Sequence, residues 1–364
     1  MATKVLVVDD TIFYRKTLKD ILSSIPDVEV VGTANNGKVA LSRIKALKPD
    51  LLTLDVEMPE MNGLEVLQEI QKQGYDVECL MVSSLTQKGG EMTIQALSLG
   101  ALDFISKPDA ATAEENTALL KKAIEPKLRA FHRRRELKNL LKGRPEPAKP
   151  TVSKQEVADL DAVIAKSKAA TARTEKSQAI ALGVSTGGPK ALNKVIPQLK
   201  PTLNVPVFVV QHMPKTFTAS LAQVLNKNSP LEVKEAQNGE VIRPNVVYIA
   251  PGGQQMKVAS AAQGQLIIRV TDDPPENNCK PSVDYLFRSV AREYGSKATA
   301  VILTGMGSDG KLGIKVMKSA GAVSIAQNAA TCVVYGMPKA VVDAGLADIV
   351  APIDAISNEI HKTV

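Results

Sequence analysis

A serine that ends an apolar run has the setting in this chain that most directly suggests chemistry. Ser185 follows the apolar residues 180–184, and the segment Thr186-Gly187-Gly188-Pro189 comes directly after it. The glycines permit a sharp turn that leaves the hydroxyl uncovered, and a proline suits the first position of a helix. The free N–H groups at the start of that helix would face a negative charge formed beside the serine. The stretch fits a serine nucleophile and, equally, a phosphate-binding loop.

Two further residues at the ends of apolar runs could complete a nucleophilic site. His212 follows residues 205–211, and Asp309 lies in the glycine-rich segment 304–310. A serine nucleophile needs a base for its proton, and the histidine needs a carboxylate that fixes its tautomer and stabilises its cation. We therefore predict Ser185 as nucleophile, His212 as base and Asp309 as its orienting carboxylate, and no cofactor for this chemistry. Hydrolysis should need neutral His212, so activity should fall below a pH near the histidine range, which is about 6.5 when the group is unperturbed. The loops that carry the three residues could supply oxyanion-hole donors, and the residues concerned are Thr186, Gly187, Gly188, Met306 and Gly307.

A second group of polar residues lies in the first third of the chain. Asp9 and Asp10, Asp55, Ser83 and Lys107 each stand at the end of a short apolar run. Three carboxylates that converge on one edge of a sheet repel one another unless a cation lies between them, and oxygen ligands favour Mg²⁺. The group is suited to neutralise a phosphoryl group on a carboxylate. One such aspartate could simply cap a helix, but four strand ends of this kind argue against that explanation.

The elements that would position this second group alternate along residues 1–126. Strand patterns alternate with helical patterns, which predicts a parallel sheet covered on both faces, here a flavodoxin-like domain with five strands. The predicted strands are residues 4–8, 28–32, 51–55, 79–83 and 103–107, and the predicted helices are residues 13–22, 37–47, 63–73 and 90–99.

The serine, histidine and aspartate belong to a second region with the same alternation. Residues 177–364 predict another doubly wound, mainly parallel α/β sheet, in which strand ends form the ligand crevice. The predicted strands are residues 180–184, 205–211, 246–250, 266–270, 298–303 and 321–326, and the predicted helices after the serine loop are residues 215–226, 282–294, 310–319 and 338–344.

Length and composition fit two domains in a reducing compartment. The chain has 364 residues, 44% of them hydrophobic, and no apolar run approaches the roughly 18 residues of a membrane helix. Acidic Asp9 and Asp10 come too early for a signal peptide. Cys79, Cys279 and Cys332 are scattered and odd in number, which predicts neither a disulfide framework nor a zinc site and favours the cytoplasm. Cys79 lies in an apolar run and is predicted to be a core residue.

The net charge of +7 is unevenly distributed between these regions. Residues 1–126 carry 13 basic and 19 acidic side chains, residues 127–176 carry 14 and 6, and residues 177–364 carry 18 and 13. The middle segment is rich in Ala, Lys, Ser, Thr and Pro, and we interpret it as a solvated linker with a weak helical face. It lacks a helix-turn-helix pattern and interleaved aromatics, so no nucleic-acid partner is expected.

The first region resembles a response-regulator receiver domain. Besides the residues above, the segment Met58-Pro59-Glu60-Met61-Asn62-Gly63 after Asp55 fits that family. The resemblance implies that Asp55 accepts a phosphoryl group from a histidine kinase. It implies that Ser83 and Lys107 contact the phosphoryl oxygens and that Phe104 is the switch aromatic. The resemblance also implies a set of Mg²⁺ ligands, which are Asp9, Asp10, Asp55 and the backbone carbonyl of Glu57.

The second region resembles the protein-glutamate methylesterases of bacterial chemotaxis, the CheB family. The matching segments are Gly183-Val184-Ser185-Thr186-Gly187-Gly188-Pro189, Gln211-His212-Met213-Pro214, Ala250-Pro251-Gly252-Gly253, Pro281-Ser282-Val283-Asp284, Thr304-Gly305-Met306-Gly307-Ser308-Asp309-Gly310 and Tyr335-Gly336-Met337-Pro338. The resemblance implies the same triad, Ser185, His212 and Asp309. It implies as substrates the glutamate methyl esters, and certain glutamines, on cytoplasmic helices of chemoreceptors, with no insertion of this chain into the membrane.

Three functions follow from these features, and the sequence favours the first. A phosphorylation-gated ester hydrolase would use all three regions, here a receiver at 1–126, a linker at 127–176 and a catalytic domain at 177–364. A nucleotide-binding regulator lacks the required Gly-x-Gly-x-x-Gly spacing. A transcription factor would have to act through the linker. The acidic receiver and the basic catalytic domain have opposite charge, which favours docking of one on the other and gating by phosphorylation at Asp55.

Overall fold

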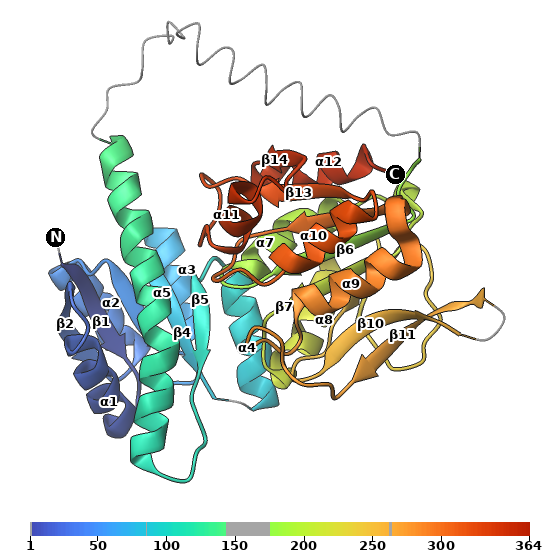
Figure 1. Ribbon diagram of the computed structural model, residues 1–364. Helices are drawn as coiled ribbons and strands as arrows, with labels where there is room; N and C mark the ends of the chain where they lie inside the picture. Colours follow the sequence, from blue (N-terminus) through green and yellow to red (C-terminus); the bar gives the residue numbers. More distant parts are fainter. Residues whose placement is uncertain (1, 85, 143–174, 262–263) are drawn as a thin grey trace, which may run out of the picture. The chain divides into compact units, whose positions relative to one another are not determined.

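A computed structural model describes residues 2–84, 86–142, 175–261 and 264–364, which form two compact units, residues 1–133 and 134–364 (Figure 1). Most of the predicted linker, residues 143–174, lies outside the described residues. The predicted boundary at residue 126 falls inside a helix that continues to Lys142, and Leu128 and Phe131 on this helix are buried. The predicted domain limits therefore remain predictions, and each unit is described by itself.

The first unit contains the predicted five-stranded parallel sheet. Its strand order is β2-β1-β3-β4-β5, which is the flavodoxin-like order. Strands β1, β3, β4 and β5 are mostly buried, whereas the edge strand β2 is mainly half-buried. The strands are β1 (Thr3–Val8), β2 (Val28–Ala34), β3 (Leu51–Asp55), β4 (Glu78–Ser83) and β5 (Asp103–Ser106). All four pairings are parallel, so the residues that follow β1, β3, β4 and β5 meet at one edge.

Five helices cover this sheet, with α1 and α5 on one face and α2 to α4 on the other (Figure 1). They are α1 (Ile12–Ser23), α2 (Gly37–Leu47), α3 (Gly63–Gln73), α4 (Gln87–Ser98) and α5 (Ala113–Lys142). The predicted limits of α2 and α3 are confirmed, and local caps explain them. Asn36 accepts a hydrogen bond from the Val39 N–H, and Asn62 and Glu65 form a capping box.

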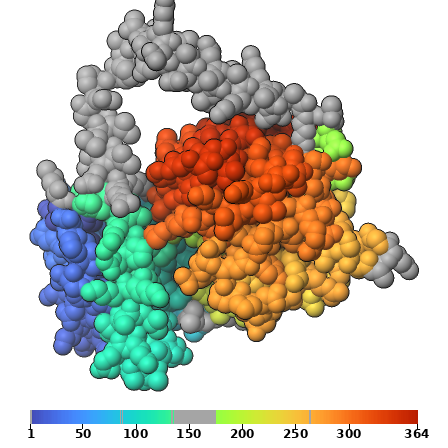
Figure 2. Space-filling view, in the orientation of Figure 1, coloured from blue at the N-terminus to red at the C-terminus, as the bar shows by residue number. Residues whose placement is uncertain are grey.

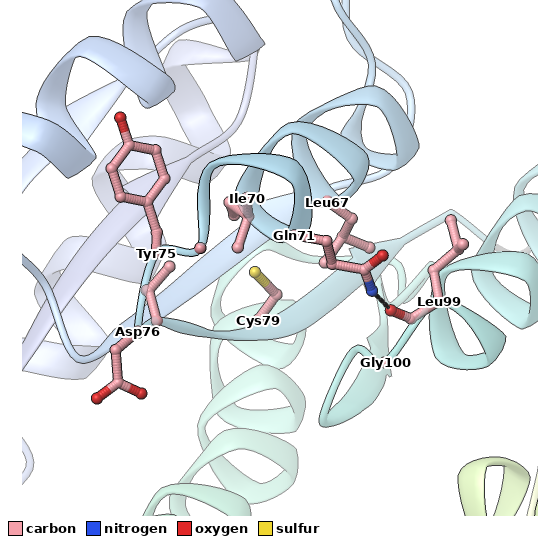
Figure 3. A pocket seen from close by; sticks show the side chains of 10 residues that line it. Leu67, Ile70, Gln71, Tyr75, Asp76, Cys79, Leu99 and Gly100 are labelled. Carbon is pink, nitrogen blue, oxygen red and sulfur yellow. Dashed lines mark hydrogen bonds between the residues drawn. The ribbon is translucent and has the colours of Figure 1, made fainter.

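A pocket of about 420 Å³ lies at the opposite end of this sheet from Asp55. It is bounded by the last turn of α3, by the start of β4 and by Leu99 and Gly100, with Cys79 at its base (Figure 3). Cys79 is 2% exposed, which confirms its prediction as a core residue, and burial raises the pKa of its thiol to about 12. The thiol is therefore protonated and unreactive at neutral pH.

The second unit is built on seven parallel strands in the order β14-β13-β12-β6-β7-β9-β8. The strands are β6 (Ala179–Val184), β7 (Val207–Gln211), β8 (Glu232–Glu235), β9 (Val246–Ile249), β12 (Ala298–Ile302), β13 (Val323–Gln327) and β14 (Ile349–Ala351). The prediction of a mainly parallel sheet is confirmed. Central β6 lies between β7 and β12, and the three strands lead to Ser185, His212 and the loop of Asp309. The topology thus brings the ends of the three runs to one edge.

Helices cover both faces of the larger sheet, with α9, α10 and α11 towards the viewer and α7 and α8 behind (Figure 1). The helices are α7 (Gly188–Val195), α8 (Lys215–Asn228), α9 (Val283–Tyr294), α10 (Lys311–Ser319), α11 (Met337–Asp343) and α12 (Ile356–His361), with short 3₁₀ turns at Ile196–Gln198, Pro201–Leu203, Gly295–Lys297 and Ile353–Ala355. Segments from α9 to the C-terminus, orange to red, form much of the visible surface of this unit (Figure 2). Phe208, Tyr248 and Phe287 fill the core beneath them.

One predicted strand pairs differently from the expectation. Residues 266–270 form most of β11 (Leu266–Thr271), which is not part of the seven-stranded sheet and instead pairs antiparallel with β10 (Gln255–Ser260). Met256, Val258 and Ile268 belong to the buried core, and Leu266 and Val270 pack against it, which fits a ribbon with one covered face. Short β8 and β14 were not predicted, because strands of four and three residues give little periodic signal.

Candidate functional site

The serine loop has the predicted strand–turn–helix form. Ser185 follows β6, its N–H donates to the Thr304 carbonyl at 3.0 Å, and its carbonyl accepts from the Gly188 N–H at 2.7 Å. The helix α7 starts at Gly188, with Pro189 in its first turn, as predicted. Ser185 is partly exposed and lies next to the start of a helix. This is a setting in which a serine can reach a substrate.

Gly187 is needed in this turn for two separate reasons. Its φ is +75°, a conformation that L residues adopt at a cost, and a Cβ there would lie 2.5 Å from Val333. We predict that Gly187→Ala lowers the free energy of unfolding by about 3 kcal/mol, from strain and overpacking together. Gly239 has φ +85°, and a Cβ added there would have nothing within 4 Å, so Gly239→Ala should lose only about 1 kcal/mol. Equal losses in denaturant titrations of the two variants would contradict the packing role of Gly187.

His212 and Asp309 form the ion pair of the site. His212 Nε2 lies 2.8 Å from Asp309 Oδ2, and the two side chains are 14% and 3% exposed. Burial alone would lower the pKa of His212, but its hydrogen bonds to Asp309 and Cys279 outweigh burial and raise the pKa to about 9. Burial alone would raise the pKa of Asp309, and the contacts with His212, Val283 and Asp284 instead lower it to about 2. The carboxylate is therefore ionised at neutral pH and stabilises the imidazolium.

The first turn of α9 holds this carboxylate in place. Asp309 Oδ2 accepts from the Val283 N–H at 2.7 Å, and Oδ1 accepts from the Asp284 N–H at 3.1 Å and from the Ser282 hydroxyl at 2.9 Å. Asn277 Nδ2 donates to the same Oδ1 at 3.1 Å and to Asp284 Oδ2 at 2.9 Å. A helix N-terminus that donates to a buried carboxylate favours its charged form. The sequence motif Pro281-Ser282-Val283-Asp284 contained this support, but its target could not be inferred from the spacing.

Gln211 connects the nucleophile loop with the base. Its Nε2 donates to the Ser185 carbonyl at 3.0 Å and to the His212 carbonyl at 3.2 Å, and the His212 N–H donates to the Val184 carbonyl at 3.1 Å. Ser185 and His212 therefore lie at neighbouring strand ends. Within the described residues, no hydrogen bond joins the Ser185 hydroxyl to His212. The structure thus brings the backbones of Ser185 and His212 together. Among the three predicted triad residues, all of them described, only His212 and Asp309 are joined through their side chains.

The predicted oxyanion donors divide into used and unused groups. The Gly188 N–H is used in the turn, where it donates to the Ser185 carbonyl. The other four predicted residues are Thr186, Gly187, Met306 and Gly307. Their N–H groups donate no hydrogen bond to any residue that the structure describes. The loop before Met306 also approaches the nucleophile, since a Cβ on Gly305 would lie 2.8 Å from Ser185 Cβ. The role of these four residues as oxyanion donors beside Ser185 stays a prediction.

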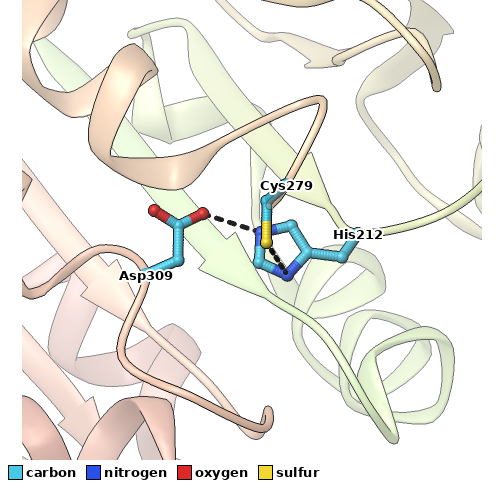
Figure 4. Close-up of side chains that lie close together, drawn as sticks. All are labelled: His212, Cys279 and Asp309. Carbon is cyan, nitrogen blue, oxygen red and sulfur yellow. Dashed lines mark hydrogen bonds and ion pairs between the residues drawn. The ribbon is translucent and has the colours of Figure 1, made fainter. Parts of the chain in front are cut away.

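Cys279 is a residue of this site that the sequence did not indicate. Its Sγ lies 3.8 Å from His212 Nδ1, the ring nitrogen that does not face Asp309 (Figure 4). The two residues are 67 positions apart, and Cys279 lies in the loop before α9. Nothing in the spacing of the three cysteines pointed to this contact.

The strand ends of the first unit form a second polar centre around Lys107. Lys107 Nζ lies 2.7 Å from Asp55 Oδ2 and 2.8 Å from Asp9 Oδ2. Burial raises the pKa of Asp55 to about 6, although the charge of Lys107 opposes this. Carboxylate oxygens of Asp9, Asp10 and Asp55 lie within 4.8 Å of one another. A compact set of three carboxylates suits Mg²⁺, so these residues fit the predicted ion.

Other predicted receiver residues surround this centre. The Ser83 hydroxyl is buried and donates to the Gly89 carbonyl at 3.2 Å instead of to Asp55. Phe104 is 8% exposed. The Glu57 carboxylate accepts a hydrogen bond from the Ser84 hydroxyl at 3.1 Å, and the role of the Glu57 backbone carbonyl as a Mg²⁺ ligand stays a prediction. Tyr14 was not predicted, and Lys107 Nζ lies 4.5 Å from the centre of its ring.

Comparison with known proteins assigns both units. Residues 180–360 match a family model described as CheB methylesterase, and residues 5–118 match one described as response regulator receiver domain. The chain is 47% identical to the protein-glutamate methylesterase/protein-glutamine glutaminase of Desulfotalea psychrophila, over 99% of this chain and 98% of that protein. It is 45% identical to the Bacillus subtilis protein of the same name, over 99% and 98%.

A solved structure supports the fold of the second unit. The CheB methylesterase catalytic domain of Thermotoga maritima is 42% identical, with a TM-score of 0.50, and the match covers 52% of this chain and 99% of that one. Among the described residues, no helix is long and apolar enough to span a membrane.

Proposed function

The chain belongs to the CheB methylesterase family with an N-terminal receiver domain, and on this basis we propose that it hydrolyses glutamate methyl esters on chemoreceptors through Ser185. The enzyme is a protein-glutamate methylesterase/protein-glutamine glutaminase by its full-length similarity to proteins of that name. The observation that most supports the chemistry is the ion pair of His212 with the buried carboxylate of Asp309, near the serine turn. The substrate segments are cytoplasmic receptor helices, and we place the enzyme in the cytoplasm with them.

The first half of the reaction transfers the acyl group to the serine. Ser185 Oγ attacks the carbonyl carbon of the ester, and its proton goes to His212. Because Nε2 is held by Asp309, Nδ1 is the nitrogen that accepts this proton. The free N–H groups beside Ser185 stabilise the oxyanion. The tetrahedral intermediate collapses, the C–O bond to methanol breaks, and His212 returns the proton to the leaving oxygen.

The second half releases the enzyme. His212 takes a proton from water, whose oxygen attacks the acyl carbon, and Ser185 leaves with that proton to give a glutamate side chain. With a glutamine substrate the same steps release ammonia in place of methanol. Asp309 stays ionised throughout, since its low pKa keeps the proton on the imidazole.

The raised pKa of His212 predicts the pH dependence. Only neutral His212 can accept the proton, and its pKa is about 9 instead of the ordinary 6.5 or so. We expect kcat/KM of the unphosphorylated enzyme to rise with pH, with a midpoint clearly above 6.5, after subtraction of the rate of Ser185→Ala. Asp309→Asn should move the midpoint to lower pH because the imidazolium loses its partner. A flat profile, or a midpoint at or below 6.5 with chemistry limiting, would argue against this base.

The receiver supplies the regulation. Asp55 is the proposed phosphate acceptor, and a histidine kinase is the proposed donor. Asp9, Asp10, Asp55 and the Glu57 carbonyl would hold Mg²⁺, which supplies positive charge for the phosphoryl oxygens. Lys107 is already within 2.7 Å of Asp55, whereas the Ser83 hydroxyl has to turn away from Gly89 to reach a phosphoryl group. That turn, with repacking of Phe104, is the proposed switch.

Asp55→Asn tests this regulation in the full chain. A small phosphodonor with Mg²⁺ should raise the methanol-release rate of the natural enzyme, and the variant should keep the basal rate and lose the whole increase, because the amide cannot accept the phosphoryl group. Asp20 is exposed on α1, and Asp20→Asn is the matched control that should respond normally. An increase that survives in Asp55→Asn would place the phosphorylation site elsewhere.

A further inference from the structure

The contact between Cys279 and His212 joins two side chains that bind soft metal ions. Cys279 Sγ lies 3.8 Å from His212 Nδ1, and both residues are partly exposed (Figure 4). The geometry points to a binding site for a soft divalent cation such as Zn²⁺, with His212 Nδ1 and Cys279 Sγ as ligands and Asp309 as the group that orients the imidazole. Two positions would be left for water or other ligands in a tetrahedral complex.

The distance between the two ligand atoms suits zinc. Zn–S bonds of about 2.3 Å and Zn–N bonds of about 2.0–2.1 Å place the sulfur and nitrogen of a tetrahedral site about 3.6 Å apart. The observed 3.8 Å therefore needs only a small contraction. Neither residue is fully buried.

The surroundings of the imidazole have the form found around metal-binding histidines. A ligating histidine usually donates its second ring N–H to a carboxylate, and His212 Nε2 faces Asp309 Oδ2 at 2.8 Å. Asp309 is held in turn by the Val283 N–H and the Ser282 hydroxyl. One oxygen of Asp309, the sulfur and a ring nitrogen lie within 4.8 Å of one another, so a negative charge stands close to the ion.

Ligand type separates this site from the other cation cluster of the chain. Thiolate and imidazole favour Zn²⁺ and related ions, whereas the receiver cluster offers only carboxylate oxygens, which suit Mg²⁺. The other two cysteines do not compete, since burial raises the pKa of Cys79 and of Cys332 to about 12. Excess Mg²⁺ can therefore saturate the receiver while a softer ion is titrated into the second site.

Occupation of the site should stop hydrolysis, a consequence that rests on the proposed function. The ion binds the Nδ1 lone pair that would otherwise accept the proton of Ser185, so His212 cannot act as base. The inhibition should be reversible by a chelator, because no covalent bond is made or broken in the substrate or the serine.

Cobalt and zinc titrations of the full-length protein test the site. In excess Mg²⁺ and thiol-free buffer, Co²⁺ should produce a sulfur-to-cobalt charge-transfer band, and Zn²⁺ should displace it. Cys279→Ser should lose the band, and the Zn²⁺ concentration for half-inhibition, relative to each variant's own metal-free rate, should rise on the order of 100-fold. Cys279→His supplies an imidazole, which also binds zinc, and should restore inhibition without the band. Cys332→Ser, in the same unit, is the matched control and should behave like the natural chain.

The outcomes separate this inference from the proposed function. Absence of the band in the natural chain, or its persistence in Cys279→Ser, overturns the metal site while leaving the triad to its own tests. A Cys279-dependent band with no effect of Zn²⁺ on hydrolysis supports the metal site and overturns the assignment of Nδ1 as proton acceptor. Thermal unfolding of Cys279→Ser near that of the natural chain ensures that a lost band reports a lost ligand.

Discussion

Ser185→Ala should lower methanol release from methylated receptor membranes on the order of 10⁴-fold or more, because the variant cannot form the acyl-enzyme. The substitution removes one oxygen from a partly exposed side chain whose hydroxyl makes no hydrogen bond to the described residues, so the turn should remain intact. The backbone contacts with Thr304 and Gly188 do not depend on the hydroxyl. The rate is to be measured with the unphosphorylated chain and again with a phosphodonor.

A control for the serine prediction lies in the same unit. Ser319 is the last residue of α10, and its hydroxyl donates to the Lys315 carbonyl. Ser319→Ala should keep the natural rate. Both variants should unfold at similar temperatures. Substantial turnover by a well-folded Ser185→Ala would show that the nucleophile is another residue or a water molecule.

The second large effect is expected for Asp309→Asn, on the order of 10⁴-fold in kcat. The amide keeps the shape of the side chain but removes the charge that stabilises the imidazolium, and its NH₂ group can favour the wrong tautomer of His212. Because Asp309 also accepts from Val283, Ser282 and Asp284, part of the change will appear as lost stability. Rates must therefore be measured well below the unfolding temperature.

Asp284→Asn is the matched control for that stability loss. Asp284 is also buried in the first turn of α9 and accepts from the Gly313 N–H at 2.6 Å and from Asn277 at 2.9 Å. Its side chain forms no hydrogen bond with His212 in the described part of the chain. We expect Asp284→Asn to lose comparable stability and to retain most of its activity. Similar rate losses in the two variants would mean that Asp309 acts only through the fold.

Much of the architecture was predictable because its signals are local. The limits of α2 and α3 follow from apolar periodicity and from Asn36 and Asn62 at their starts, and the parallel strands appear as buried aliphatic runs. The turn after Ser185 was predictable from two glycines and a proline in order. The pairing of residues 266–270 was not predictable, because the sequence pattern of a strand does not show which other strand it pairs with. Here these residues pair with the nearby strand β10 in a separate ribbon.

The candidate site was predictable as a set of strand ends but not as a network. Parallel strands lead Ser185, His212 and Asp309 to one edge, which topology alone implies. The contacts of Cys279 with His212 and of Asn277 with Asp309 join loops separated by 67 and 32 positions, and no local pattern records such pairs. The pKa of His212 likewise depends on burial and on those partners, so the spacing of residues in the sequence could not reveal its shift above the unperturbed value.

The assignment of Ser185 as nucleophile is tested most directly by covalent labelling. The natural full-length chain should be treated with a fluorophosphonate probe and digested, and the labelled peptide identified by mass spectrometry. We expect stoichiometric label on Ser185, loss of methyl-ester hydrolysis in proportion to labelling, and strongly slowed labelling in His212→Ala. Full hydrolytic activity in a preparation whose Ser185 is completely labelled, or complete inactivation with Ser185 unlabelled, would contradict the account.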